Sequence, residues 1–166
     1  MQAQSGFSAG RNTRFILLAS LFYLGFGIVA IIWRLIAGAP SPLALNTHRP
    51  HLAAEAILFS AALGLNILFD LYAHRLFPSA RALFRSLGNA VGRIAARDAA
   101  LLAAASALGE ELLFRGAVQP SLGLPAAAVV VALSHFPLRR DLILWPFYAL
   151  VIGFVLGYLR ILGGDI

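Results

Sequence analysis

Two neighbouring glutamates and an arginine are the residues of this chain best suited to chemistry. Glu110 and Glu111 are two of only three Glu in the sequence, and they lie in an apolar, Ala- and Leu-rich run at about residues 99–118. That run is long enough to cross a bilayer as a helix. A carboxylate at membrane depth costs roughly 2.5–3.5 kcal/mol on insertion scales, so acids kept there indicate a function.

The spacing assigns the two acids to different roles. Glu111 and Arg115 are four residues apart, one turn along the same helical face, which predicts an ion pair. Glu110 lies about 100° around the helix and has no such local partner. A carboxylate without a cation in apolar surroundings suits a general base. The alternative is a helix end at the membrane surface, where all three side chains meet water.

His135 is the next candidate. It lies in a short apolar segment, about residues 125–136, which a tight connection at residues 119–125 joins to the glutamate-bearing run. Segments joined by so short a connection pack as antiparallel neighbours, so we expect His135 to face Glu110. A carboxylate beside an imidazole can hold and deprotonate a water, which is what peptide hydrolysis needs. The alternative is a hydrogen-bonded core histidine with no catalytic role.

The sequence places Glu110 and His135 at different depths along their helices if both helices begin at the membrane surface. At about 1.5 Å per residue, Glu110 lies roughly 18 Å along its helix from Ala99, whereas His135 is close to the Arg139-Arg140 loop. Equal depth therefore requires tilted helices, or a third helix that begins outside the hydrocarbon.

The composition is that of an integral membrane protein. The 166 residues are 60% hydrophobic and only 12% charged, against about a quarter charged in soluble domains. We predict an all-α fold, a polytopic transmembrane helix bundle of about five spans plus one amphipathic surface segment. The expected spans are residues 15–37, 52–72, 99–118, 125–136 and 142–159.

The chain divides into four regions. Residues 1–14 are expected to form a polar cytoplasmic tail, 15–73 two transmembrane helices, and 99–166 the core with the candidate site. Between them, residues 74–98 carry Arg at spacings near a helical turn or its multiples, which is typical of an amphipathic helix on the membrane surface. A plain cytoplasmic loop is the alternative for this region.

The net charge of +6 arises from Arg alone, because the chain has no Lys. The Arg residues are spread over the loops rather than gathered among aromatics, which favours contact with anionic lipid over nucleic-acid binding. Nine of the 13 Arg fall on the side of the N-terminus, so the N-terminus is expected in the cytoplasm. Abundant Ala and Arg without Lys indicate a bacterial protein of the plasma (inner) membrane.

The residues give little support for a cofactor. No Cys is present, which excludes thiol nucleophiles, disulfides and Cys-based metal sites. His48 and His51 are a conceivable metal pair in a loop, with solvated loop histidines as the alternative. We therefore predict no cofactor; a divalent metal is compatible with the chemistry but is not supported by ligand spacing.

The motif Glu110-Glu111-Leu112-Leu113-Phe114-Arg115-Gly116, followed by Gln119-Pro120 and Leu133-Ser134-His135-Phe136, resembles the CPBP family. These are the CAAX-processing and bacteriocin-processing intramembrane proteases, also called the ABI family. Residues 153–160 resemble the glycine-bearing helix that precedes the last motif of the family. The resemblance covers about residues 99–166.

The resemblance implies an intramembrane endopeptidase similar to the type II CAAX prenyl endopeptidases. Glu110 and His135 would activate the attacking water, and Glu111 with Arg115 would hold the site in shape. The implied partners are membrane lipids and a membrane-anchored peptide or protein substrate, without nucleic acid. Some descriptions of the family call its members metal-dependent.

The sequence departs from the family pattern in two respects. The second family motif is Phe-x-x-x-His, and Val131 stands where the Phe is expected. The family continues into a helix with His-x-x-x-Asn or Asp, which is implied to bind the oxyanion, whereas this sequence reaches Ile166 where that helix is expected to begin. Loss of one oxyanion donor costs about 10²–10³ in rate.

Two other functions therefore remain as alternatives to the protease. One is a catalytically incomplete membrane protein of the same fold, with a role in bacteriocin immunity or partner binding. The other is a small transporter with an acidic intramembrane site, although the internal repeat expected of such a protein is not evident.

Overall fold

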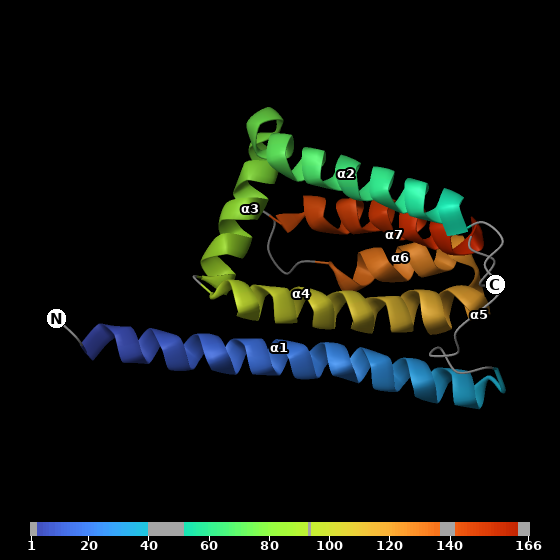
Figure 1. The fold of residues 1–166 in the computed structure, drawn as a ribbon, viewed down its shortest axis with the longest axis horizontal. Helices are drawn as coiled ribbons and strands as arrows, with labels where there is room; N and C mark the ends of the chain where they lie inside the picture. The colour runs from blue at the N-terminus through green and yellow to red at the C-terminus, as the bar shows by residue number, and fades with distance from the viewer. Residues whose placement is uncertain (1–2, 40–51, 93, 137–141, 163–166) are drawn as a thin grey trace.

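The computed structural model describes residues 3–39, 52–92, 94–136 and 142–162, and in these ranges the regular elements are helices without a strand (Figure 1). The prediction of an all-α fold is confirmed. In chain order the elements are α1 (Ala3–Ile36), α2 (Leu52–Leu76), α3 (Pro78–Val91), α4 (Ala96–Glu110), η1 (Glu111–Val118), α5 (Gln119–Leu122), α6 (Leu124–Ser134) and α7 (Leu144–Leu162).

Two of the described helices are long and apolar enough to cross a membrane, residues 14–36 of α1 and the whole of α7. Shorter apolar helices occur at residues 59–73 and in α6. α1 begins at Ala3, well before the predicted boundary at residue 15, so the polar start of the chain is helical as well. The α-helix that ends at Glu110 has 15 residues, and the chain then continues directly as the π-helix η1.

α1, α2, α4 with η1, α6 and α7 lie roughly along one direction, and α3 crosses them at one end (Figure 1). α1, α4 and α7 run one way, while α2 and α6 run the other way. α3 connects the end of α2 to the beginning of α4 at that end of the bundle. Its Arg81 and Arg85 are exposed, and its C-terminal Gly92 adopts φ +71°.

α1 packs along α4 and η1 through residues that alternate at spacings of four and three. This is the spacing of a left-handed helix seam. Several of its members are small or buried, which allows the two backbones to approach closely. The residues of this seam are Ile16, Ser20, Tyr23, Gly27 and Ala30.

Three contacts set the register of this parallel pair. A Cβ on Gly109 would lie 2.5 Å from the carbonyl oxygen of Tyr23, so only glycine fits there. Further along, the ring of Phe26 lies edge-on to that of Phe114, with centroids 5.9 Å apart. Near the end of α1, the indole N–H of Trp33 donates to the hydroxyl of Ser121 at 3.1 Å.

The prediction of a loop at residues 119–125 is wrong, because the helix continues through α5 to Leu122. The chain reverses at Gly123 alone, with φ +83°, a left-handed conformation that favours glycine. Pro125 occupies the first turn of α6, where its missing N–H costs nothing. This single turn makes η1 and α6 antiparallel neighbours.

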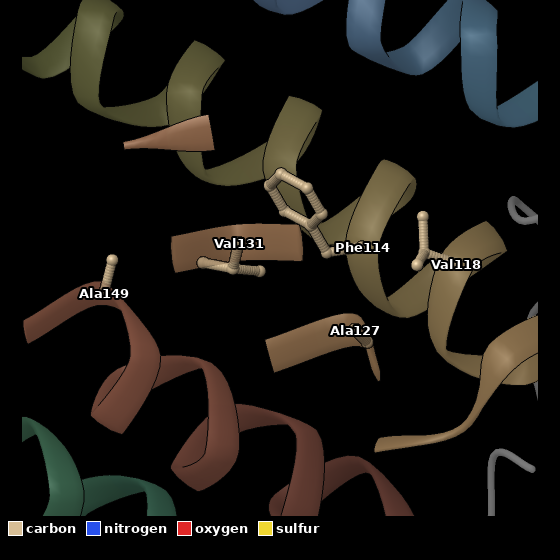
Figure 2. Close-up of a cluster of buried hydrophobic side chains, with 5 residues drawn as sticks. All are labelled: Phe114, Val118, Ala127, Val131 and Ala149. Carbon is tan, nitrogen blue, oxygen red and sulfur yellow. The ribbon is translucent and has the colours of Figure 1, made fainter. Parts of the chain in front are cut away.

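The buried core lies between η1, α6 and α7 (Figure 2). The Phe114 ring is 1% exposed, and Val131 packs in the same cluster. α6 and α7 approach closely at Gly153, which has no side chain. A Cβ there would lie only 3.2 Å from the Cα of Ala128. The cluster consists of Phe114, Val118, Ala127, Val131 and Ala149.

One turn further along α7, Gly157 accommodates a buried amide. The Gln119 side chain is 6% exposed, and its Nε2–H donates to the carbonyl oxygen of Gly157 at 2.8 Å. This hydrogen bond ties α5 to α7. The approach is possible because Gly157 carries no side chain.

We expect Gly157→Ala to destabilise the fold by about 1–3 kcal/mol, the usual cost of overpacking. The new Cβ would collide with Cδ1 of Leu124 and lie 2.8 Å from Oε1 of Gln119, so these buried side chains or the helices that carry them must shift. Unfolding by SDS in mixed micelles measures the change. Gly64→Ala is the control, because a Cβ on that glycine of α2 meets nothing within 4 Å. Equal stability of the two variants would contradict this packing.

Candidate active site

The candidate site is built on a π-helix that the sequence did not predict. α4 is regular up to Glu110, and the next eight residues form η1. At the junction the Glu111 N–H is shared between the carbonyl oxygens of Ala107 and Leu108. Wide π turns inside α-helices are rare and are often found at functional sites.

η1 is enclosed on both sides, and this accounts for the burial of its second half. Five consecutive residues, 114–118, are buried, although a regular helix at a surface buries only one face. α1 covers one side of η1 and α6 covers another, as the Phe26–Phe114 contact and the core cluster show.

The ion pair expected from the spacing forms within η1. Nη1 of Arg115 lies 3.4 Å from Oε1 of Glu111, at i and i+4. The Arg115 side chain is 5% exposed, whereas the Glu111 side chain is 49% exposed. The guanidinium is therefore the deeply buried partner, and the carboxylate reaches it from the edge of the bundle. The charge of Arg160 on α7 also acts on Glu111.

Glu110, the last residue of α4, is half-buried. Among the residues that the structure describes, no ion pair engages its carboxylate. It interacts electrostatically with His135 on α6, and with Arg115 and Glu111 on η1. Glu110 is thus the acid without an ion pair in the described part of the chain, and the charge of His135 acts on it.

The position of the turn at Gly123 resolves the conflict of depths. Glu110 and His135 are thirteen and twelve residues from Gly123 in opposite directions, so both lie about 18 Å from the turn. α6 therefore ends partway along the bundle, as Figure 1 shows. Because Gly109 lies against Tyr23, near the middle of the apolar stretch 14–36 of α1, this level is the centre of that stretch.

The geometry of His135 defines its tautomer. The residue caps the C-terminus of α6, and its Nδ1 lies 2.8 Å from the carbonyl oxygen of Val131. Nδ1 also lies 3.1 Å from Oγ of Ser134. A carbonyl can only accept, so the shorter contact is a hydrogen bond when Nδ1 carries the proton, and in that tautomer Nε2 keeps its lone pair. The Ser134 hydroxyl donates to the same carbonyl at 2.7 Å, and the Trp145 ring lies 5.7 Å from the imidazole, centre to centre.

The same contact explains why Val131 can replace the Phe of the family motif. Its carbonyl oxygen orients His135 through the backbone, which any residue supplies. Its side chain is 5% exposed in the core cluster, where a β-branched residue also packs well.

The described residues do not provide a metal site. No group of three or more His, Asp or Glu comes together in residues 3–39, 52–92, 94–136 and 142–162. Glu111 is already engaged by Arg115, which leaves one carboxylate and one imidazole. His48 and His51 lie outside the described residues. We therefore derive no step through a metal ion.

The described residues thus form a helical bundle in which His135 acts electrostatically on the carboxylate of Glu110. Residues 93–166 match the model of the family described as type II CAAX prenyl endopeptidase Rce1-like. The predicted resemblance to the CPBP family is thereby confirmed over this part of the chain. Comparisons with curated proteins and with solved structures give no significant match.

Sequence reasoning did not assign the contacts of two polar residues, Tyr23 beside Glu110 and Gln119 closer to the turn at Gly123. Tyr23 of α1 interacts electrostatically with Glu110, and Gln119 links α5 to α7. The alternating four-and-three spacing along α1 was the available signal for Tyr23, since it marks the face that meets another helix. For Gln119, the signal was an amide in an otherwise apolar segment.

Proposed function

We propose that this protein is an intramembrane endopeptidase that hydrolyses a peptide bond in a membrane-anchored peptide or protein. The observation that carries the proposal is the common level of Glu110 and His135 on antiparallel neighbours inside the bundle. The family match supports the same assignment at the level of CAAX-protease-like membrane endopeptidases.

In the proposed reaction, Glu110 takes a proton from a water as the water oxygen attacks the scissile carbonyl carbon. Nε2 of His135 accepts the second hydrogen of that water and so orients it, because Nδ1–H is committed to Val131. When the tetrahedral intermediate collapses, the C–N bond breaks and Glu110 returns its proton to the leaving nitrogen. The products are one carboxylic acid and one amine.

Glu111 and Arg115 have a structural role in this proposal. Their ion pair lies within the first turns of η1, directly after Glu110. By holding those turns, the pair keeps the Glu110 carboxylate at the level of His135. The pair also neutralises Arg115, which would otherwise be a buried charge.

The proposal includes an arrangement in the bacterial plasma membrane. α1, α2, α4 with η1, α6 and α7 would lie within the bilayer, and α3 along its cytoplasmic surface with Arg81 and Arg85 among lipid headgroups. α1 and α7 run in the same direction, which supports opposite sides for the two termini.

A reporter fused after Ile166 is therefore expected to be read on the outer face of the membrane. The physical reason is the excess of Arg on the side of the N-terminus, which orients the first span. A fusion after Gly92, next to α3, is the matched control and should be read in the cytoplasm. Cytoplasmic activity of the Ile166 fusion would contradict this topology.

Hydrolysis itself is tested with a membrane-anchored peptide and the purified protein in liposomes prepared in ¹⁸O-labelled water. Cleavage by an activated water leaves one ¹⁸O in the new C-terminal carboxyl group, which mass spectrometry of the product detects. If the peptide stays intact over a range of sequences and anchors, the catalytically incomplete member of the same fold becomes the better description.

A further inference from the structure

α1 lies outside the residues that match the family, yet two of its hydroxyl-bearing residues lie on the seam with α4. Ser20 and Tyr23 are three residues apart on the face that packs against α4. The Ser20 hydroxyl oxygen is buried and has no hydrogen-bond partner among the described residues. Burying a hydroxyl without a partner is costly, so apolar residues would be expected on a purely structural seam.

Tyr23 is held at the level of Glu110 by its backbone. Gly109 precedes Glu110 directly, and a Cβ there would lie 2.5 Å from the Tyr23 carbonyl oxygen. The two helices are thus in backbone contact one residue away from the candidate base. A shift of α1 along α4 is opposed by the Trp33–Ser121 hydrogen bond near the other end of α1.

The ring of Tyr23 is fixed by an aromatic cluster. It lies edge-on to Phe26, with centroids 5.9 Å apart and planes at 86°. Phe26 in turn lies edge-on to Phe114 of η1. Such edge-to-face pairs are favourable, so the cluster joins α1 to the segment that follows Glu110.

Two side chains from outside α4 and η1 act electrostatically on the carboxylate of Glu110. The Glu110 carboxylate interacts electrostatically with Tyr23 of α1 and with His135 of α6. The other charged groups that face it, Glu111 and Arg115, belong to η1 and pair with each other.

We propose that the Tyr23 hydroxyl positions the hydrolytic water. This role rests on the proposed function. A water in a buried site needs two to four polar partners. Here it would donate one hydrogen to Glu110 and the other to Nε2 of His135. The O–H of Tyr23 would donate to one of its lone pairs, and the remaining lone pair is then directed at the scissile carbonyl carbon.

Tyr23→Phe tests this role, because it keeps the aromatic ring and removes only the hydroxyl. We expect kcat for the membrane-anchored peptide to fall about tenfold to a hundredfold with KM nearly unchanged, as for a misplaced reacting group. The acid limb of the pH profile should move to higher pH, since the carboxylate loses a donor that reaches it through the water. Tyr158→Phe changes an exposed tyrosine of α7 and should leave kcat, KM and the acid limb of the pH profile unchanged.

A second measurement applies even if the wild type cleaves nothing. Infrared titration follows the band of the protonated Glu110 carboxyl group, which is identified by its absence in Glu110→Gln. The midpoint of this titration should lie at higher pH in Tyr23→Phe than in the wild type or in Tyr158→Phe. An unchanged midpoint, or unchanged kcat in an active wild type, overturns the role of Tyr23 while leaving hydrolysis by Glu110 and His135 intact. A wild type that does not cleave refutes the proposed function instead.

Discussion

Glu110→Gln is expected to lower the rate of peptide cleavage by about 10²–10⁴, the contribution of a positioned general base. Glutamine has nearly the same size and polarity, but it cannot take a proton from the water. The measurement is kcat in liposomes, with product quantified by mass spectrometry. Asp98→Asn is the matched control on the same helix, because that acid pairs with Arg97 near the start of α4 and lies far from His135. Its rate should equal that of the wild type.

Combining Glu110→Gln with His135→Ala gives a sharper form of this prediction. Both groups are proposed to act on one water, so removing the second after the first should cost little more. The double variant is then expected to be about as slow as the slower single variant. Fully additive losses would show that the two side chains act in separate steps, against the proposed mechanism.

Glu111→Gln is expected to reduce the free energy of unfolding by about 3 kcal/mol, because it leaves the buried guanidinium of Arg115 without its counter-charge. The value is at the lower end for broken buried ion pairs, since the Glu111 side chain is half-exposed. Unfolding by SDS in mixed micelles measures this change, and the same samples report any loss of helix.

The variant Glu111→Gln/Arg115→Met separates the charge from the contact. Met fills much of the volume of Arg without bringing a charge, so the double variant should recover most of the lost stability. Failure to recover would mean that Arg115 stabilises η1 through contacts other than the ion pair. If the double variant is stable but cleaves poorly, the pair positions Glu110, as proposed.

Local features of this protein followed from the sequence because they depend on groups within one or two helical turns. The Glu111–Arg115 pair needs only i and i+4 spacing, and the structure forms it at 3.4 Å. The apolar segments that became α1 and α7 follow in the same way from composition and length. The motif around Glu110 was also sufficient to indicate the family that residues 93–166 match.

The beginnings and ends of the helices were less well predicted from the sequence. Proline and glycine between residues 119 and 125 indicated a loop, but Pro120 is compatible with the first turn of a helix, and only Gly123 needs a left-handed backbone. Polar residues after Ala3 indicated a tail, yet polar side chains do not prevent backbone hydrogen bonding, and α1 includes them.

The tertiary structure alone decided that Tyr23 of α1 lies beside Glu110, whereas the sequence already predicted His135 there. The reversal at Gly123 brings His135 to the level of Glu110, as a longer connection centred there would also do. The missing side chain of Gly109 lets the backbone of α1 approach so closely that Tyr23, 87 residues before Glu110 in the sequence, lies beside it. The burial of η1 likewise depends on packing against α1 and α6. The sequence by itself determined the helices and the pair within one turn, because those interactions are local. Which faces of distant helices meet depends on close contacts that no local spacing encodes.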